Sequence, residues 1–154
     1  MVRQLADISG DERESLIMHR VLSAPDLRQP QTWVDVASYL NAVPVLHQTP
    51  ESHGTSRGLG EGIFQKSCAS CHHDDARGDD DGFVPSLRNQ HYSYLVAQVR
   101  RISKYSRHNV DENLVQFFRS LEPEEVNAVV DYITRLEGPV KDRKAMRSNG
   151  VVVD

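Results

Sequence analysis

The amino-acid sequence predicts an all-α protein. Apolar residues recur at the helical spacing of three and four in several stretches, and no alternating strand pattern competes with them. The hydrophobic content of 38% and the charged content of 26% are typical of a water-soluble chain with a small core. A length of 154 residues suits one domain, or one domain and a further fraction.

The clearest helix is predicted over residues 123–137. Pro123 stands in its first turn with two glutamates behind it, and acidic residues favour the amino end of a helix dipole. Gly138 and then Pro139 end the pattern. The buried stripe consists of Val126, Val129, Val130 and Ile133.

Four more helices follow from the same periodicity. Pro30 favours a helix start before residues 31–41, where Trp33, Val36 and Leu40 share a face. A weaker pattern covers residues 12–22. The remaining predicted helices cover residues 59–70 and 92–103.

The chain divides into four parts. Residues 1–44 form a helical segment, and residues 45–57, rich in Pro, Gly, Ser and Thr, indicate a linker. Residues 58–137 are expected to form the main domain, followed by a loosely ordered tail over residues 138–154. Inside the main domain, the acidic run at residues 74–82 is expected to be a solvated loop.

One internal similarity stands out. Residues 33–44 resemble residues 126–139, with Tyr39 corresponding to Tyr132 and a proline at the end of each segment. Two amphipathic helices that each carry a tyrosine can look alike by chance. The alternative is that the chain holds the end of one domain and then the whole of a second.

Charge and hydropathy exclude some classes of function. The net charge of −4 and pI near 6.0 do not favour nucleic-acid binding, which usually needs a basic face. No apolar run approaches the ~20 residues of a membrane-spanning helix. The first residues are too polar for a signal peptide.

Both cysteines of the chain lie in the sequence CASCHH, residues 68–73. Cys-x-x-Cys-His is the attachment sequence of c-type haem. In that chemistry the thiols of Cys68 and Cys71 add across the two vinyl groups of the porphyrin, and His72 becomes the proximal iron ligand. A zinc site would need four ligands, and the chain has no second cysteine pair. A thioredoxin-like redox pair would need a βαβ context, which is missing.

The sequence resembles class I cytochrome c over residues 58–137. In that family a glycine and an aromatic residue precede the first cysteine by eight and four positions, where this chain has Gly60 and Phe64. The resemblance implies that the glycine lets its helix cross the C-terminal helix closely, and that Phe64 packs on Tyr132. It also implies that the carbonyl group of Pro85 accepts a hydrogen bond from Nδ1–H of His72. The stretch QHYSYLVAQ looks especially like two-haem cytochromes made of tandem class I domains.

The sixth iron ligand is left open. The family places a methionine in the loop before the last helix, but that loop here contains none, and Val110 or Leu114 stands at the expected place. His108 could ligate instead, or it could be an ordinary loop residue. The iron could also be open on that side. Residues 1–44 resemble the rear half of a class I domain, in which Met18 would be the axial methionine, although Met18 also suits ordinary helix packing.

The resemblance implies electron transfer through one covalently attached haem c, and no enzymatic activity. Redox partner proteins would dock transiently at the haem edge, and a dimer is left open. An alternative is a haem-based gas or redox sensor, or a minor peroxidase with an open distal site. Another is an electron-delivery module of a larger redox enzyme. Because haem c is attached outside the bacterial cytoplasm, we expect a periplasmic or otherwise exported protein whose leader is absent from this sequence.

Overall fold

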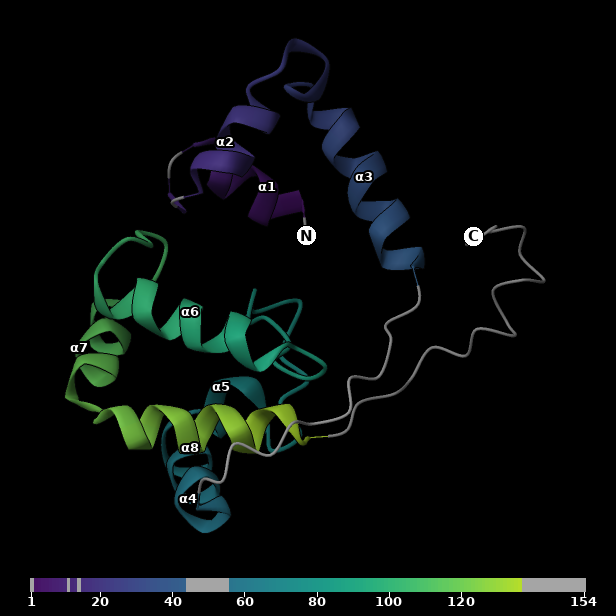
Figure 1. Cartoon of the computed structure of the whole chain (residues 1–154). Coiled ribbons are helices and arrows are strands. Elements are labelled where there is room, and N and C mark those ends of the chain that lie inside the picture. Colours follow the sequence, from purple (N-terminus) through teal and green to yellow (C-terminus); the bar gives the residue numbers. More distant parts are fainter. Residues whose placement is uncertain (1, 11, 14, 44–55, 137–154) are drawn as a thin grey trace.

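A computed structural model describes residues 2–10, 12–13, 15–43 and 56–136. The described part is helical, with isolated β-bridges in place of strands, so the all-α prediction is confirmed (Figure 1). None of its helices is long and apolar enough to cross a membrane. The helices are α1 (Val2–Ser9), α2 (Leu16–Leu22), the 3-10 helix η1 (Pro25–Leu27), α3 (Pro30–Ala42), α4 (Arg57–Ser67), α5 (Ala69–His72), α6 (Tyr92–Ser103), α7 (Glu112–Ser120) and α8 (Pro123–Thr134).

Two α-helices, α1 and α7, and the 3-10 helix η1 lie outside the predicted set. Helix α1 has only eight residues and buries no side chain, so its apolar side is too short a pattern to stand out in the sequence. Helix α7 occupies part of the segment expected to be a loop. Its start is marked by Asp111, whose side chain accepts a hydrogen bond from the Asn113 backbone N–H at 2.8 Å. The side chain of Val115 is completely buried. Both the N-cap and this tertiary packing therefore stabilise α7.

Helices α4 and α8 cross at the centre of the main domain. The crossing is close because Gly60 has no side chain: a Cβ there would lie 2.1 Å from the carbonyl oxygen of Ala128. Phe64, fully buried on the next turn of α4, places its ring 5.5 Å from the ring of Tyr132 on α8. Both contacts are the ones that the family resemblance implies. Together they fix the helix that leads into the Cys-x-x-Cys-His sequence.

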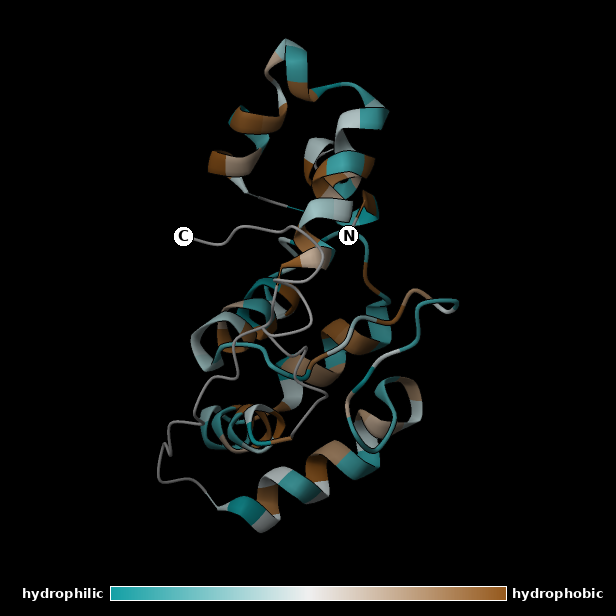
Figure 2. Cartoon of the chain, turned by 90° about the vertical axis from the view of Figure 1, so that its right-hand side faces the viewer, coloured by the Kyte–Doolittle hydropathy of each residue, from teal (hydrophilic) through white to brown (hydrophobic). Residues whose placement is uncertain are grey.

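The hydrophobic core is continuous around this crossing. Helix α6 adds Leu95 and Val96, and the phenolic O–H of Tyr92 donates to Oδ1 of Asn127 on α8 at 3.0 Å. The helices are amphipathic, as the alternation of hydrophilic and hydrophobic stretches along each ribbon shows (Figure 2). The buried cluster consists of Phe64, Ala76, Leu95, Val96, Val129, Val130, Tyr132 and Ile133.

The N-terminal helices α1 to α3 form a separate group on one side of the main domain, in the upper part of Figure 1. The loop between α1 and α2 joins the two groups through the buried Arg13. Its guanidinium donates to the Tyr94 hydroxyl at 2.7 Å and to Oε1 of Gln98 at 3.2 Å. An isolated antiparallel bridge links Arg13 to Arg107, and the His108 backbone N–H donates to the Glu12 carbonyl at 2.9 Å.

Further contacts tighten the same junction. Nδ2 of Asn109 donates to Oδ2 of Asp7 at 2.7 Å, and the Arg3 guanidinium lies 4.5 Å above the ring of Phe83. Burial and the neighbouring Arg13 lower the pKa of the Arg107 guanidinium. Most of the predicted linker, at residues 44–55, and the tail, at residues 137–154, lie outside the described residues.

Candidate haem-attachment site

The turn between α4 and α5 brings three chemically active side chains together. The Cys71 and His72 backbone N–H groups both donate to the Cys68 carbonyl oxygen, at 3.2 Å and 2.9 Å. Residues three and four positions apart on a helical turn share one side, so the two thiols and the imidazole lie on the same side of the chain. Both cysteines are free thiols, with Cys68 partly buried and Cys71 exposed.

A hydrogen bond orients the imidazole of His72. Its Nδ1 lies 2.9 Å from the carbonyl oxygen of Pro85. A carbonyl oxygen can only accept, so Nδ1 carries the hydrogen, and Nε2 is left with its lone pair directed away from this bond. Nε2 is therefore free to bind a metal, while the hydrogen bond at Nδ1 fixes the ring and raises its donor strength.

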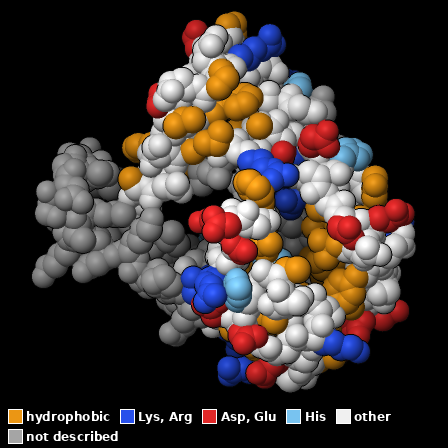
Figure 3. Space-filling view, turned by 180° about the vertical axis from the view of Figure 1, so that it is seen from behind, with side chains coloured by type: hydrophobic (Ala, Val, Ile, Leu, Met, Phe, Trp, Pro, Cys, Tyr) orange, Lys and Arg blue, Asp and Glu red, His pale blue; other side chains and the backbone are white. Residues whose placement is uncertain are grey.

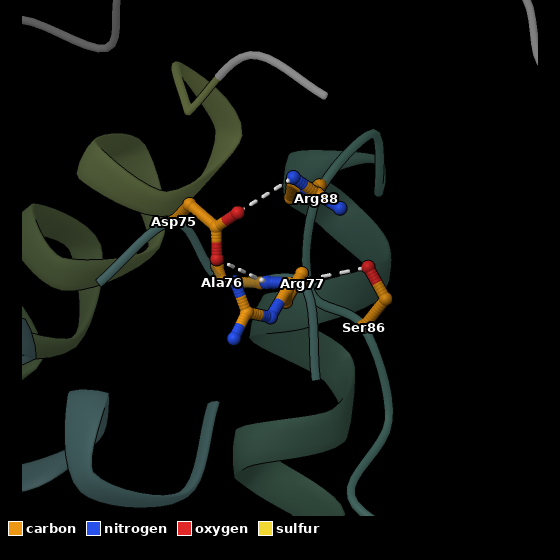
Figure 4. A network of polar contacts seen from close by, with 5 residues as sticks. All are labelled: Asp75, Ala76, Arg77, Ser86 and Arg88. Atoms are coloured by element: carbon orange, nitrogen blue, oxygen red, sulfur yellow. Dashed lines mark hydrogen bonds and ion pairs between the residues drawn. The ribbon is translucent and has the colours of Figure 1, made fainter. Parts of the chain in front are cut away.

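A network of polar contacts holds the chain on both sides of Pro85 (Figure 4). The Asp75 carboxylate accepts from the Arg77 backbone N–H at 3.2 Å and from the Arg88 guanidinium at 2.9 Å. The Ser86 hydroxyl donates to the Ala76 carbonyl oxygen at 3.3 Å, and the Leu87 N–H donates to the same oxygen at 2.9 Å. Residues 75–77 are thus tied to residues 86–88.

The acidic run at residues 74–82 therefore does more than the expected solvated loop. Ala76 is fully buried and belongs to the core. Gly78 is buried with φ +75°, and a Cβ there would lie 2.5 Å from the Val84 carbonyl oxygen. The segment is a loop with most of its residues exposed, as predicted, and the two buried small residues are what the composition of the run did not reveal. The order Ala-Arg-Gly inside the acidic run was the available signal.

The thiol and the imidazole are both held in their neutral forms. Burial raises the pKa of the Cys68 thiol to about 11, and the neighbouring Cys71 adds to this increase. Burial also lowers the pKa of His72, a change that the hydrogen bond to Pro85 opposes and the nearby His73 reinforces. Neutral imidazole is the form that binds metal ions.

The two candidates for the sixth ligand lie on other elements. His108 is exposed in the loop between α6 and α7, and its ring centroid lies 5.7 Å from that of Tyr105 in an edge-on contact. Met18 lies on α2 in the N-terminal group and is 37% exposed. Both assignments stay predictions.

The donor set fits haem c. Two free thiols and an imidazole with its Nδ1 already hydrogen-bonded stand on one turn, while a zinc ion would need further ligands. Within the described residues no group of three or more His, Cys, Asp or Glu side chains could hold a metal ion. The fold and this site define a class of protein, the small helical cytochromes that carry haem through thioether bonds.

The comparison with protein families agrees. The cytochrome c family model matches residues 59–137, half of the chain. The chain therefore belongs to the cytochrome c family, and its fold is that of class I cytochrome c.

Two solved structures extend the likeness to the N-terminal helices. Reduced recombinant cytochrome c4 from Pseudomonas stutzeri aligns with a TM-score of 0.72 and 22% identity over 88% of this chain and 79% of that chain. Cytochrome c4 from Acidithiobacillus ferrooxidans aligns with a TM-score of 0.70 and 22% identity over 88% of this chain and 83% of that chain. A comparison with curated proteins finds no match.

Proposed function

We propose that this chain transfers single electrons through one haem c attached to Cys68 and Cys71, with Nε2 of His72 as the proximal ligand. The main support is the hydrogen bond between Nδ1 of His72 and the Pro85 carbonyl, because it fixes the ring and leaves Nε2 to bind the metal. Membership of the cytochrome c family supports covalent haem and electron transfer. The structure of the similar cytochrome c4 from Acidithiobacillus ferrooxidans is said to support a complex-induced tuning of electron transfer.

Each residue of the proposed site has a separate role. Haem, when bound, supplies an iron couple that gains and loses one electron. Cys68 and Cys71 hold the group on the turn after α4, and the Pro85 carbonyl keeps the His72 ring in one orientation. The buried Phe64 and Tyr132 keep water from the neighbouring interior. A preorganised site of this kind should change little between the two oxidation states.

The attachment is tested by the mass of the denatured protein. For this test the chain is to be expressed with an export signal in a bacterium that matures c-type cytochromes. The denatured wild type should carry the added mass of one haem. Cys68→Ala with Cys71→Ala should carry none, and a Ser70→Ala control should keep the full addition. An unmodified wild-type mass under these conditions contradicts the proposal.

The proximal role of His72 needs a separate readout. His72→Ala should retain the covalent mass but lose the spectrum of the histidine-ligated wild-type haem, with imidazole in the buffer partly restoring it. His73→Ala is the matched control, because His73 is the adjacent histidine of the same turn. An unchanged spectrum in His72→Ala would exclude this residue as the ligand.

For the opposite side of the iron we propose His108 or Met18 as the ligand to be tested first. The absence of methionine between residues 103 and 123 also favours the second candidate function, an open site that binds gases or peroxide. Carbon monoxide added to the ferrous protein separates the two. Immediate spectral change at low concentration indicates an open iron, and resistance that disappears in His108→Ala or Met18→Ala identifies the ligand.

We further propose that the protein is exported to the periplasm. We also propose that redox partners dock transiently at the haem edge. The net charge of −4 favours partners with a basic patch. Electron-transfer rates with such a partner should fall as salt increases, because screening shortens the range of the attraction. A rate independent of ionic strength would exclude this electrostatic docking.

A further inference from the structure

Two arginines meet around one buried amide at the junction between the N-terminal helices and the main domain. The Arg13 guanidinium, from the loop after α1, donates to Oε1 of Gln98 at 3.2 Å. The Arg107 guanidinium, from the loop after α6, donates to the same oxygen at 3.5 Å. Arg13 is 9% exposed and Gln98 is 7% exposed. Basic side chains are visible at the surface where the N-terminal group, in the upper part of Figure 3, meets the main domain. Two positive charges therefore share one neutral acceptor.

Hydrogen-bond donors exceed acceptors in this cluster. A guanidinium carries five N–H donors and accepts nothing. Both guanidiniums contact Oε1 of Gln98, and Nε2 at the other end of the amide is buried without a hydrogen-bond partner among the described residues. Exchanging the two ends of the amide would set Nε2 against both cations, so the orientation follows from charge. The unpaired donor at Nε2 therefore favours an acceptor that a ligand supplies.

Charge is unbalanced in the same direction. Within the described part of the chain, neither Arg13 nor Arg107 forms an ion pair. Asp7 is a nearby carboxylate, but its Oδ2 accepts from Asn109 at 2.7 Å. Burial and the charge of Arg13 lower the pKa of Arg107, and Tyr94 and Asp7 oppose this change only in part. A water molecule would satisfy the amide but not the two like charges, whereas an anion would satisfy both.

We propose that Arg13, Arg107 and Gln98 together bind an oxyanion. A guanidinium can pair with two oxygens of one carboxylate, phosphate or sulfate, and such charge-assisted hydrogen bonds are stronger than neutral ones. Nε2 of Gln98 adds a neutral donor. Two sources share this chemistry: a propionate group of the haem, and a free oxyanion such as sulfate or phosphate. The first source rests on the function proposed above, and the second does not.

The position of Gln98 favours the haem as the source. Leu95, one turn earlier on the same side of α6, belongs to the core cluster against which Cys68 packs. The amide therefore lies beside the core that also borders the proposed attachment turn. Haem carries ionised propionates, and a buried carboxylate needs a paired cation. Arg13 would then give the N-terminal group a direct part in binding the cofactor of the main domain.

The test compares Gln98→Glu with the wild type, both as mature full-length protein. Glutamate has the size of glutamine, but it removes the Nε2 donor and places a carboxylate between the arginines, so the bound oxyanion should be displaced. For the haem source, NMR is recorded on the ferrous protein under carbon monoxide, where the iron is diamagnetic. We expect nuclear Overhauser effects between the propionate methylene protons and the guanidinium protons of Arg13 and Arg107. Gln98→Glu should lose them.

A free oxyanion is tested by thermal unfolding in sulfate at constant ionic strength. Binding to this site should raise the melting temperature of the wild type in a saturable way. Gln98→Glu should weaken the apparent affinity for sulfate at least about tenfold, because it loses a donor and gains a like charge. The general stabilisation by sulfate acts through exclusion from the protein surface, so it should affect both proteins alike.

Two further variants make the result specific. Gln116→Glu makes the same chemical change at an exposed position of α7 and should behave as the wild type in both measurements. Arg107→Gln removes one cation without adding a buried carboxylate. It should lose the oxyanion as Gln98→Glu does, and it decides the question if Gln98→Glu does not fold.

The proposal is overturned when the wild type shows neither the haem contacts nor a saturable effect of sulfate. It is equally overturned when Gln98→Glu keeps whichever effect the wild type shows. The mass of the denatured protein reports haem attachment independently. A haem-free mass would contradict the proposed function, while the sulfate titration would still test the oxyanion site.

Discussion

Gly60 acts through the space that it leaves empty. A side chain at this position would collide with the backbone of Ala128, which cannot turn aside as a long side chain could. The residue therefore sets the distance between α4 and α8. That distance in turn sets the position of Phe64 against α8. His72 works at the same scale, where one hydrogen bond to Pro85 selects the tautomer and the direction of Nε2.

Gly60→Ala should therefore destabilise the protein strongly. The added methyl group forces the two helices apart, and we expect a loss of about 3 kcal/mol in the free energy of unfolding. The matched control is Gly62→Ala in the same helix, where a Cβ meets nothing within 4 Å. This control should be neutral or stabilising by up to ~1 kcal/mol, since alanine favours helix. Urea denaturation of the mature protein measures both, and equal stabilities would refute the close crossing.

Gly78→Ala should damage the site more than the fold. Its φ of +75° and the contact with the Val84 carbonyl both oppose a side chain. The strain falls beside Pro85, so the bond to His72 should weaken. We expect a shifted reduction potential and a perturbed imidazole NMR signal. Gly58→Ala, which has open space in α4, serves as the control, and an unchanged potential in Gly78→Ala would argue against this coupling.

Among the elements, α8 has the best-defined start. Glu122 caps the helix, and the Glu125 carboxylate returns to accept from the Glu122 N–H at 2.8 Å, while Pro123 occupies the first helical position. The capping box satisfies donors that the helix itself cannot pair. It holds the amino end of the helix on which Tyr132 and the core valines depend.

Glu125→Ala should cost about 1 kcal/mol of stability through the lost cap bond. Glu124→Ala removes the same charge from the same turn without breaking that bond. It should cost only a few tenths of a kcal/mol, through the helix dipole. Thermal unfolding followed by circular dichroism compares the two. The difference isolates the cap, and identical melting temperatures would show that Glu125 acts through charge alone.

Sequence periodicity predicted the helices α4, α6 and α8 that build the core and missed the short helices α1 and α7. Helix α8 was predicted because its valines repeat and Pro123 marks its start. Helix α1 was missed because its eight residues are too few for a periodic pattern to stand out. At the candidate site, Cys68, Cys71 and His72 were predicted as haem-binding residues from their spacing, and that role stays a prediction. The roles of Asp75 and Arg88 were not predicted, because their ion pair joins positions that only the folded loop brings together.

At the scale of the whole molecule, the two helical groups meet around a buried arginine. Arg13 connects the loop after α1 to Tyr94 and Gln98 on α6, so an N-terminal residue is paired inside the main domain. A buried amide and a buried guanidinium are stable only while they satisfy each other. The junction should therefore be held together by polar bonds more than by apolar area.

Arg13→Ala should loosen this junction. It leaves Gln98 with only the longer bond from Arg107, at 3.5 Å, and should cost about 1–3 kcal/mol. Hydrogen exchange should accelerate in α1 and at the start of α6, while α4 and α8 keep their protection. Arg20→Ala, an exposed arginine of α2, removes the same charge and should change neither. Uniform acceleration across all helices would indicate global unfolding instead.

The bond between His72 and Pro85 spans thirteen residues, and both cysteines lie just ahead of it. By contrast, the close contact of α4 joins Gly60 to Ala128 on α8, which lies much further along the chain. Because short loops close with less entropy loss than long ones, the nascent polypeptide can present its thiols and its ring as a local unit before the terminal helix arrives. The enzymes that attach haem would then reach the thiols while they are accessible. The later packing of α8 on α4 would complete the fold around the attached haem.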